Sequence, residues 1–580
     1  MYATLSAEEN MRGLQSIGGS RYERVATAFH LGSLAVALGW LVFTARNIWF
    51  GTDDFDFLFR RGLHWPVASI WAPHNEHWST IPILIYRASY SSWGLQTALP
   101  YTAVNIVAHV LVAHLLWRVM RSAGVEPLVN AALVCVYLVL GSGASGVLRA
   151  FQIGFTGAVL LGWVFIILEN HPAPTRTRQA AAWAVGVTSL LFSGVSITFI
   201  ATGGVVVLMR RGWRAALLAI APALVTFVIW FIAVGHRKYA APESWSNTIL
   251  KLPGYVYTGL TATASGMFGI RTFGAVILVA LAVWLIVRVR RVTPAEVPIL
   301  CGAAGAVFFF FVTGLGRDAF GTAEGAADRY VAVAVALALP SVGLALSELV
   351  RWPARSTAPD RFNTLRLLAA LSVLMFAGVS NLTALLSSRD AMVRQSRQFE
   401  RQLVAAAQIA ASEPTIPNSY PIYDTEKRYV PNLEELLAVA ARGQLPTGVQ
   451  PRPFDVLAAA TYVQLGVTGS ALYSSGGADV ASVSPRLTEL SASAGCRSIV
   501  AGNRSVRVKL RVAVPTSLAV QTGASGALLA QLSLPHFPGT GPPFVLPPLG
   551  AGGSGWLDIA AAPALVTVVL PPGGVLGPIC

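Results

Sequence analysis

Repeated apolar runs of membrane-spanning length constrain this chain more than any other feature of its sequence. A helix needs about 20 apolar residues to cross about 30 Å of hydrocarbon. Runs that approach or reach that length lie at residues 25–46, 98–120, 128–148, 150–169, 179–194, 196–210, 213–235, 271–289, 295–315, 329–350 and 365–387. Backbone polar groups in lipid must be satisfied internally, so such runs form helices. We therefore expect a polytopic α-helical membrane protein with about 11 transmembrane helices.

Composition supports this expectation and excludes other classes. Of the 580 residues, 54% are hydrophobic and only 12% are charged, whereas soluble proteins carry about 25% charged residues. A disordered chain, a collagen, a coiled coil and a soluble multidomain enzyme are excluded as descriptions of the whole chain. The net charge of +15 would favour nucleic acid in a soluble protein. Here it fits cytoplasmic loops and anionic headgroups, so we expect the bilayer and no nucleic acid as partner.

The short loops predict an orientation in the plasma membrane. With a cytoplasmic N-terminus, every inner loop is basic, through Arg118, Arg121, Arg176, Arg178, Arg210, Arg211, Arg214, Arg288, Arg290, Arg291, Arg351, Arg355, Arg361 and Arg366. An odd number of spans then places residues 388–580 outside, with the loops 47–97, 236–270 and 316–328. No cleavable signal is expected, because the first apolar run is long enough to stay as an anchor. The stretch 179–210 is interrupted at Phe192-Ser193-Gly194 and could instead form a re-entrant hairpin.

Three domains follow from the change in composition along the chain. Residues 1–387 form the predicted transmembrane domain, 388–482 a mainly helical outer region, and 483–580 a β-sandwich. Strands are indicated by the alternation of apolar and polar residues over 505–513 and by the Gly/Pro turns after it. Cys496 and Cys580 bracket this module, and an oxidising exterior would allow a disulfide between them. Two free thiols remain the alternative.

Polar residues are densest in the first outer loop. Asp53 and Asp54 lie just beyond the first span, where a carboxylate could accept a proton from a hydroxyl while a lipid-borne donor approaches from the membrane. The alternative is that one of them caps the following helical turn. Further along, His74-Asn75-Glu76-His77 forms a second cluster. Its histidines lack the i, i+4 spacing of a zincin site, so hydrogen bonding to substrate is favoured over a divalent metal, and Glu76 is a candidate second acid.

Basic residues on the predicted outer side are informative because the positive-inside rule disfavours them. They include Arg237, Lys238, Arg271, Arg317 and Arg329. Headgroup contact and snorkelling are the alternative explanation for many of them. Arg317 and Arg329 are favoured as functional residues, since they flank one short acidic loop, and an arginine that enters the membrane needs an anionic partner.

This arrangement resembles the GT-C superfamily of integral-membrane glycosyltransferases. Those enzymes combine a polytopic helical domain with an acidic motif and interfacial helices in the first outer loop, and often carry an outer C-terminal domain. Thr52-Asp53-Asp54 corresponds to the acidic motif, 78–94 to the interfacial helix and 388–580 to the outer domain. The β-module is similar to the carbohydrate-binding modules of actinobacterial arabinofuranosyltransferases, although the first loop does not follow theirs.

The resemblance implies transfer of a sugar from a polyprenyl-phosphate donor to a hydroxyl of a cell-envelope glycan or glycolipid, with inversion. It implies Asp54 or Asp53 as general base, with Glu76 nearby. Arg317, Arg329, Arg237, Lys238 and Arg271 would bind the donor phosphate, and His74, Asn75, His77 and Tyr330 the acceptor. No nucleotide-binding motif is present, and no cofactor is predicted. A lipid-linked saccharide flippase or transporter, an oligosaccharide polymerase or ligase, and an outer glycan-binding protein remain alternatives.

The predicted topology can be tested by cysteine labelling. A cysteine introduced near residue 450 should react with a membrane-impermeant maleimide in intact cells, because residues 388–580 are expected outside. A cysteine introduced near residue 175 should react only after lysis. Labelling of the first position only in lysed cells would reverse the topology.

Overall fold

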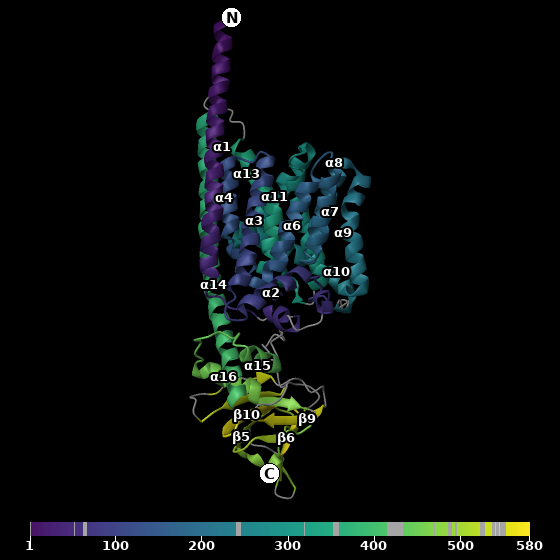
Figure 1. Ribbon diagram of the computed structural model, residues 1–580, viewed down its shortest axis with the longest axis vertical. Coiled ribbons are helices and arrows are strands. Elements are labelled where there is room, and N and C mark those ends of the chain that lie inside the picture. Colours follow the sequence, from purple (N-terminus) through teal and green to yellow (C-terminus); the bar gives the residue numbers. More distant parts are fainter. Residues whose placement is uncertain are drawn as a thin grey trace. The chain divides into compact units, whose positions relative to one another are not determined.

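The chain consists of two compact units (Figure 1). The computed structural model describes the chain except for Met1, Thr52, 62–66, 239–244, 318–319, 352–358, 414–432, 469, 485–489, 494–495, 523–527, 536–539, 541–543, 546–552 and Cys580. The helical unit comprises Met1–Ile48, His64–Tyr86 and Ala98–Val393, and the C-terminal unit comprises Trp49–Leu63, Arg87–Thr97 and Arg394–Cys580. Two parts of the first predicted outer loop therefore belong to the C-terminal unit.

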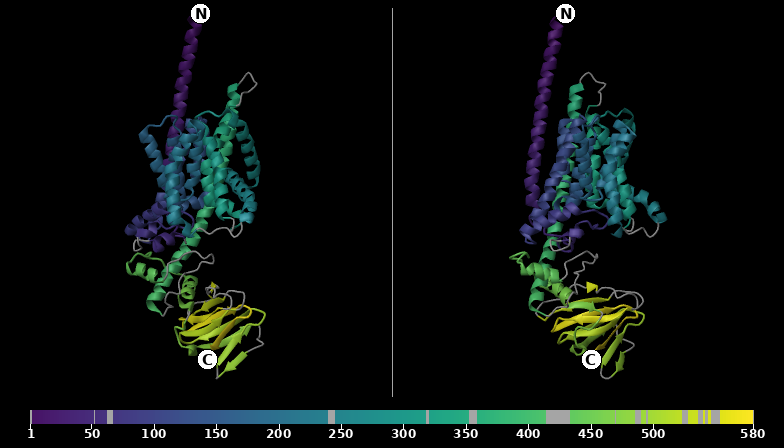
Figure 2. Two further views of the ribbon diagram at one scale, coloured as in Figure 1. Left: turned by 90° about the vertical axis from the view of Figure 1, so that its right-hand side faces the viewer. Right: turned by 45° about the vertical axis from the view of Figure 1, so that its right-hand side comes forward.

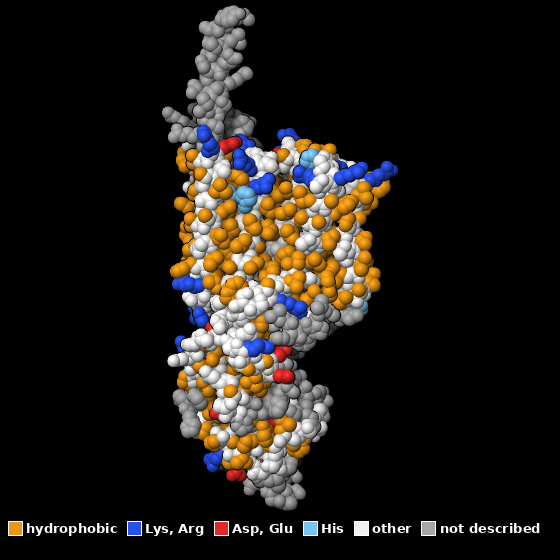
Figure 3. Space-filling model, viewed as in Figure 1, with side chains coloured by type: hydrophobic (Ala, Val, Ile, Leu, Met, Phe, Trp, Pro, Cys, Tyr) orange, Lys and Arg blue, Asp and Glu red, His pale blue; other side chains and the backbone are white. Residues whose placement is uncertain are grey.

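The helical unit consists of α-helices of very different lengths (Figure 2). In chain order they are α1 (Tyr2–Ala45), α2 (Thr80–Trp93), α3 (Leu99–Ser122), α4 (Pro127–Leu138), α5 (Ala144–Leu148), α6 (Ile153–Glu169), α7 (Arg176–Leu190), α8 (Ser196–Arg211), α9 (Trp213–Ala233), α10 (Trp245–Phe268), α11 (Gly274–Arg288), α12 (Val297–Arg317), α13 (Asp328–Val350) and α14 (Pro359–Ser412). The last residues of α2 and α14 belong to the C-terminal unit. Apolar side chains cover the sides of the bundle (Figure 3).

The predicted polytopic helical fold is confirmed, but fewer helices than expected have full spanning length. Among the described residues, 7 helices are long and apolar enough to cross a membrane, or up to 8 if the bent pair α4 and α5 counts as one span. The predicted spans at α7, α8 and α11 are helices of 15, 16 and 15 residues. At about 1.5 Å per residue they are shorter than about 30 Å of hydrocarbon. The chain is a multi-pass membrane protein.

The break at Phe192-Ser193-Gly194 separates two helices that each run between the two ends of the bundle. At one end, Arg211 of α8 pairs with Glu169 of α6. At the other end, the Leu191 carbonyl accepts a hydrogen bond of 3.0 Å from the Ile81 N–H, in the first predicted outer loop. We call the end with Arg211 the inner end and the end with Ile81 the outer end, after the predicted topology. Lys and Arg gather mainly at the inner end (Figure 3).

The outer parts of α1 and α14 lie side by side. The Arg389 Nε of α14 donates to the Thr44 carbonyl of α1 at 3.2 Å. The last turn of α1 and residue 389 therefore lie together.

Residues 236–270 were expected to form an outer loop, but most of this segment is the helix α10. Pro253 lies inside this helix, which packs on α12 and α13.

Strands form two sheets in the C-terminal unit, as the sequence predicted, and two helices precede them, α15 (Leu433–Ala441) and α16 (Pro453–Gln464). The strands are β1 (Leu465–Thr468), β2 (Ala478–Ser484), β3 (Leu490–Ser493), β4 (Cys496–Val500), β5 (Val506–Val512), β6 (Thr516–Gln521), β7 (Leu529–Ser533), β8 (Phe544–Val545), β9 (Ser554–Ile559), β10 (Ala564–Leu570) and β11 (Val575–Ile579). One sheet has the order β1-β9-β6-β11-β4-β3 and the other β2-β5-β10-β7-β8. Their buried faces are rich in valine and leucine.

The predicted disulfide stays a prediction. Cys580 and the side chain of Cys496 lie outside the described residues. Their sequence neighbours Ile579 and Arg497 are cross-strand partners of β11 and β4. A disulfide that closes a loop of this length would stabilise the module by about 4 kcal/mol through lost chain entropy. Mass spectrometry of a non-reduced digest should show the linked peptides. Alkylation of both thiols in the native protein would contradict the bond.

Candidate active site

A cavity of about 270 Å³ lies within the helical unit, at its outer end. Its polar lining comes from Glu76 and His77 of the first loop, Thr198 of α8, Thr313 and Arg317 of α12, and Tyr330 of α13. The rest of the lining is mainly apolar and aromatic, from Phe155, Val195, Ile197, Phe227, Phe231, Phe309, Val312 and Leu315. A few polar groups on an apolar wall are typical of ligand sites.

A tight two-residue turn presents Glu76 and His77 to this cavity. His74 and His77 exchange both backbone hydrogen bonds, each of 2.9 Å. Between them, Asn75 has a φ of 51°, a left-handed conformation that asparagine tolerates better than most residues. The His74 ring meets Phe151 edge-on, with the ring centres 5.1 Å apart. The sequence HNEH therefore serves a turn, in which Asn75 is exposed.

An ion pair between Glu76 and Arg317 joins the first loop to the outer end of α12. The His77 Nε2 lies 3.6 Å from the same carboxylate oxygen. Burial alone would raise the pKa of Glu76, but the charges on protonated His77 and on Arg317 hold it below its usual value. Burial lowers the pKa of His77 itself to about 4. His77 is therefore neutral near pH 7, and Arg317 is the cation that keeps Glu76 ionised.

His77 has one ring nitrogen with no protein partner. Its Nδ1 is buried and makes no hydrogen bond within the described part of the chain. The ring packs edge-on against Phe155, at 5.3 Å between ring centres. Gly194, in the break between α7 and α8, faces this nitrogen, and a Cβ at Gly194 would lie 3.1 Å from it. A larger residue there would crowd His77 Nδ1 and the adjacent part of the cavity.

Arg329 and Tyr330 form a second group beside the cavity. Arg329 pairs with Glu324, and its guanidinium carbon lies 4.7 Å from the centre of the Tyr330 ring. Tyr330 is buried and packs on Phe155 and Phe309, with ring centres 6.2 and 6.0 Å away. The predicted acidic partners of these arginines are therefore protein carboxylates. For Arg317 the partner is Glu76, more than two hundred positions away in the sequence. The sequence singled out both residues but did not predict that they form a pair.

The two aspartates of the acidic motif belong to the C-terminal unit and differ from each other. Asp53 is exposed, whereas Asp54 is 3% exposed and its Oδ2 accepts a hydrogen bond of 2.6 Å from the Gly51 N–H. Asp54 therefore stabilises the local turn, a structural role similar to the helix capping expected from the sequence as the alternative to catalysis. Asp56, which the sequence did not single out, forms a buried ion pair of 3.1 Å with Arg61.

Other predicted site residues are described in part. Arg237 and Lys238 end the 3-10 helix Gly235–Lys238, and Arg271 begins the 3-10 helix Arg271–Phe273. Their side chains lie outside the described residues. Within the described part of the chain, no group of three or more His, Cys, Asp or Glu side chains is arranged to hold a metal ion.

Several lining residues were not predicted from sequence. Phe155, Thr198, Phe227, Phe231 and Thr313 lie in apolar runs that looked like ordinary spans. One signal was available, the Phe192-Ser193-Gly194 interruption. A break between two spans must place its polar backbone against protein rather than lipid, and this break borders the cavity.

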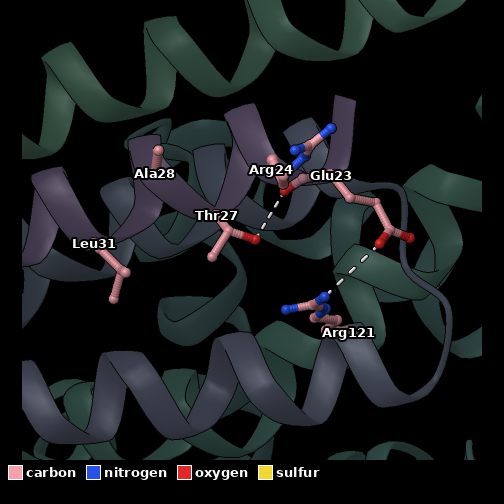
Figure 4. Close-up of a pocket in the computed structure, with 6 residues that line it drawn as sticks. All are labelled: Glu23, Arg24, Thr27, Ala28, Leu31 and Arg121. Carbon is pink, nitrogen blue, oxygen red and sulfur yellow. Dashed lines mark hydrogen bonds and ion pairs between the residues drawn. The ribbon is translucent and has the colours of Figure 1, made fainter. Parts of the chain in front are cut away.

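A second hollow lies at the inner end, between α1 and α3 (Figure 4). In Figure 4, the Glu23 carboxylate points toward Arg121, and their closest charged atoms are 3.7 Å apart. Both side chains are more than half exposed, so their attraction is screened by water. The hollow contains none of the predicted site residues, and the outer cavity is the better candidate.

Fold and cavity together define a multi-pass membrane protein with an acid, an arginine and a neutral histidine at one end of an apolar cavity. No protein-family model matches the chain. Over 134 residues, 21% of this chain, it is 26% identical to the ESX-3 secretion system protein EccD3 of Mycolicibacterium smegmatis, and it spans 26% of that protein's length.

Solved structures give further likenesses. The chain is similar to ArnT from Cupriavidus metallidurans in the apo state, with a TM-score of 0.46, 14% identity, and coverage of 77% of this chain and 96% of that one. For ArnT from the same organism bound to undecaprenyl phosphate, the TM-score is 0.43 and the identity 15%, with coverage of 71% of this chain and 84% of that one. For arabinosyltransferase EmbB from Mycobacterium smegmatis, the TM-score is 0.29 and the identity 12%, with coverage of 94% of this chain and 64% of that one.

Burial of neutral His77 predicts a pH dependence of stability. Its folded pKa of about 4 lies below the unfolded value of about 6.5. Between these values the unfolded chain binds the proton and the folded chain does not, so stability is lost as pH falls through this window, by up to about 3 kcal/mol. Thermal unfolding in detergent at pH 7 and pH 5 should show a smaller loss for His77→Gln than for the wild type. His236→Gln, at an exposed histidine, is the control. An equal loss in His77→Gln would contradict the assignment.

Proposed function

We propose that this protein is a GT-C type membrane glycosyltransferase, which moves a sugar from a polyprenyl-phosphate donor to a hydroxyl acceptor on the outer side. The observation that carries the proposal is the Glu76–Arg317 pair at the end of an apolar cavity within the membrane helices. An apolar wall next to an arginine suits a ligand that is a lipid at one end and a phosphate at the other.

Arg317 is the proposed phosphate ligand. Negative charge on the phosphate oxygens grows as the glycosidic bond breaks, and a guanidinium stabilises that charge through charge-assisted hydrogen bonds. The Arg317 Nε makes no hydrogen bond within the described residues, so a donor remains for a ligand. Arg329, next to Tyr330, is a second candidate, and Arg237, Lys238 and Arg271 remain candidates from the sequence.

The acceptor side needs a base and hydrogen-bonding groups. Asp53 or Asp54 is the proposed base, which takes the proton of the acceptor hydroxyl as that oxygen attacks the anomeric carbon and the polyprenyl phosphate leaves. Attack from the opposite side inverts the anomeric carbon. Exposed Asp53 is free of the turn contact that occupies Asp54. His77 Nδ1 is the proposed acceptor-site contact, because it is buried at the cavity without a described partner.

Glu76 has a further role in this proposal. Its carboxylate pairs with Arg317, and a donor phosphate would compete with it for the same guanidinium. Phosphate binding would then remove the cation that lowers the pKa of Glu76, and the freed carboxyl group could take up a proton and serve as the second acid. Donor binding would precede acceptor activation.

A transfer assay tests the function. Purified protein should transfer sugar from a synthetic polyprenyl-phosphate sugar to a soluble glycan acceptor. Replacing the true base by asparagine, in Asp53→Asn or Asp54→Asn, should lower the rate by about 100- to 10,000-fold with donor binding retained. Glu434→Gln, at an exposed acid of α15, should have no effect. Wild-type rates in both aspartate variants would rule out this base, and movement of the lipid-linked sugar across vesicles without transfer would favour a flippase.

Donor binding tests the role of Arg317 and Glu76 separately. Arg317→Ala should weaken binding of a polyprenyl phosphate, whereas Glu76→Gln should strengthen it by about threefold to tenfold, because the competing carboxylate is gone. Lys251→Ala, at an exposed cation of α10, is the control. Weaker binding in Glu76→Gln would show that the glutamate positions Arg317 rather than competing for it.

A further inference from the structure

Strand β5 carries a row of cations that the proposed reaction does not use. Its residues alternate strictly, so that Val506, Val508, Leu510 and Val512 are buried while Arg507, Lys509 and Arg511 are exposed. Alternate residues of a strand point to the same face and repeat at about 6.8 Å. Three positive charges therefore stand in a line on one face of the five-stranded sheet.

The neighbouring strands place hydroxyl, amide and apolar side chains beside this row. Lys509 lies opposite Ser482 of β2 and Thr567 of β10, and Thr567 lies opposite Gln531 of β7. Arg507 lies opposite Ser484. Asp479, opposite Arg511, is the one acid that these four strands place on this face within the described residues. On β10, the half-buried apolar residues Leu565 and Val569 lie opposite Arg511 and Arg507. The charge on this face is thus mainly positive.

The three cationic side chains have no partner within the described part of the protein, neither in a hydrogen bond nor in an ion pair. Like charges at neighbouring positions of a sheet repel each other. Lysines are common on edge strands, where they prevent edge-to-edge aggregation. That explanation fails for β5, because β2 and β10 flank it on both sides. The unpaired row is therefore suited to an external anion.

We infer that this face, Arg507, Lys509 and Arg511 with the surrounding hydroxyl and amide groups, binds a linear anionic polysaccharide. A polymer with carboxylates or phosphates at intervals can contact several cations of the row at once, and each contact adds a charge-assisted hydrogen bond. Its sugar hydroxyls can bond to the serine and glutamine side chains of the same face. The inference does not depend on the transferase proposal.

A bilayer surface is the less suitable partner. Membrane-surface elements combine basic residues with large apolar side chains that enter the lipid. The exposed large apolar residues of the described C-terminal unit are Trp93, Phe454, Leu472 and Val514. None of them lies on β2, β5, β7 or β10.

Binding of polygalacturonate by the full chain in zwitterionic detergent tests the inference. The wild type should bind it with an affinity that falls as salt rises. Each of Arg507→Gln, Lys509→Gln and Arg511→Gln should weaken binding at least about threefold, and the triple variant should lose it. Arg504→Gln, at an exposed arginine of the same module outside the strand, is the matched control and should bind like the wild type. Thermal unfolding checks that each variant is folded.

Three outcomes would overturn the inference. The first is no binding of polygalacturonate by the wild type, or equal binding by the triple variant. The second is equal binding of neutral arabinan, which would show that charge is not recognised. The third is binding to vesicles containing phosphatidylglycerol with the same dependence on the three cations, which would assign the face to lipid. Sugar transfer, measured separately on the wild type, shows whether a failure here also concerns the proposed transferase function.

Discussion

In hydrocarbon, every backbone N–H and C=O group needs a hydrogen-bond partner within the protein. The structure of the helical unit depends on how these groups find partners where its helices break. The break between α4 and α6 is held by two asparagines. Asn105 of α3 donates to the carbonyls of Gly146 and Val147, at 2.9 and 3.0 Å. Asn381 of α14 accepts from the Gly141 N–H at 2.9 Å and donates to the Gly266 carbonyl at 3.0 Å. The irregular backbone is therefore tied to protein rather than left to lipid.

These hydrogen bonds require that α14 comes very close to the break between α4 and α5. A Cβ at Gly141 would lie 2.2 Å from the Asn381 carbonyl oxygen, so only glycine allows α14 to come close enough for the side-chain amide to reach. The breaks are also where polar chemistry can be placed in a membrane protein. Gly194, in the break between α7 and α8, meets His77 at the cavity.

Charged groups at the two ends of the bundle are used differently. At the inner end, Arg211 pairs with Glu169, and Arg288 pairs with Glu296 and Glu348, so acids and arginines connect helix ends. Removing one partner of such a buried pair leaves an uncompensated charge, which is strongly destabilising. At the outer end, the Glu76–Arg317 pair lines a largely apolar cavity, whereas the Glu23–Arg121 pair beside the inner hollow is more than half exposed to water. A pair in contact with a cavity can exchange one partner for a ligand, and this difference favours the outer end as the functional one.

The sequence by itself determined the helical class, the positions of the apolar helices, and the strand pattern of the C-terminal unit, because hydrophobic length and period act locally. It also singled out Glu76, His77, Arg317 and Tyr330 as residues of interest. Only the tertiary structure decided that these four, from three separate segments, share one cavity, and that Glu76 rather than a loop acid near Arg317 is its partner. The same holds for the apolar lining and for the turn contact of Asp54. Pairings between distant segments depend on helix packing in three dimensions, which no local pattern of residues specifies.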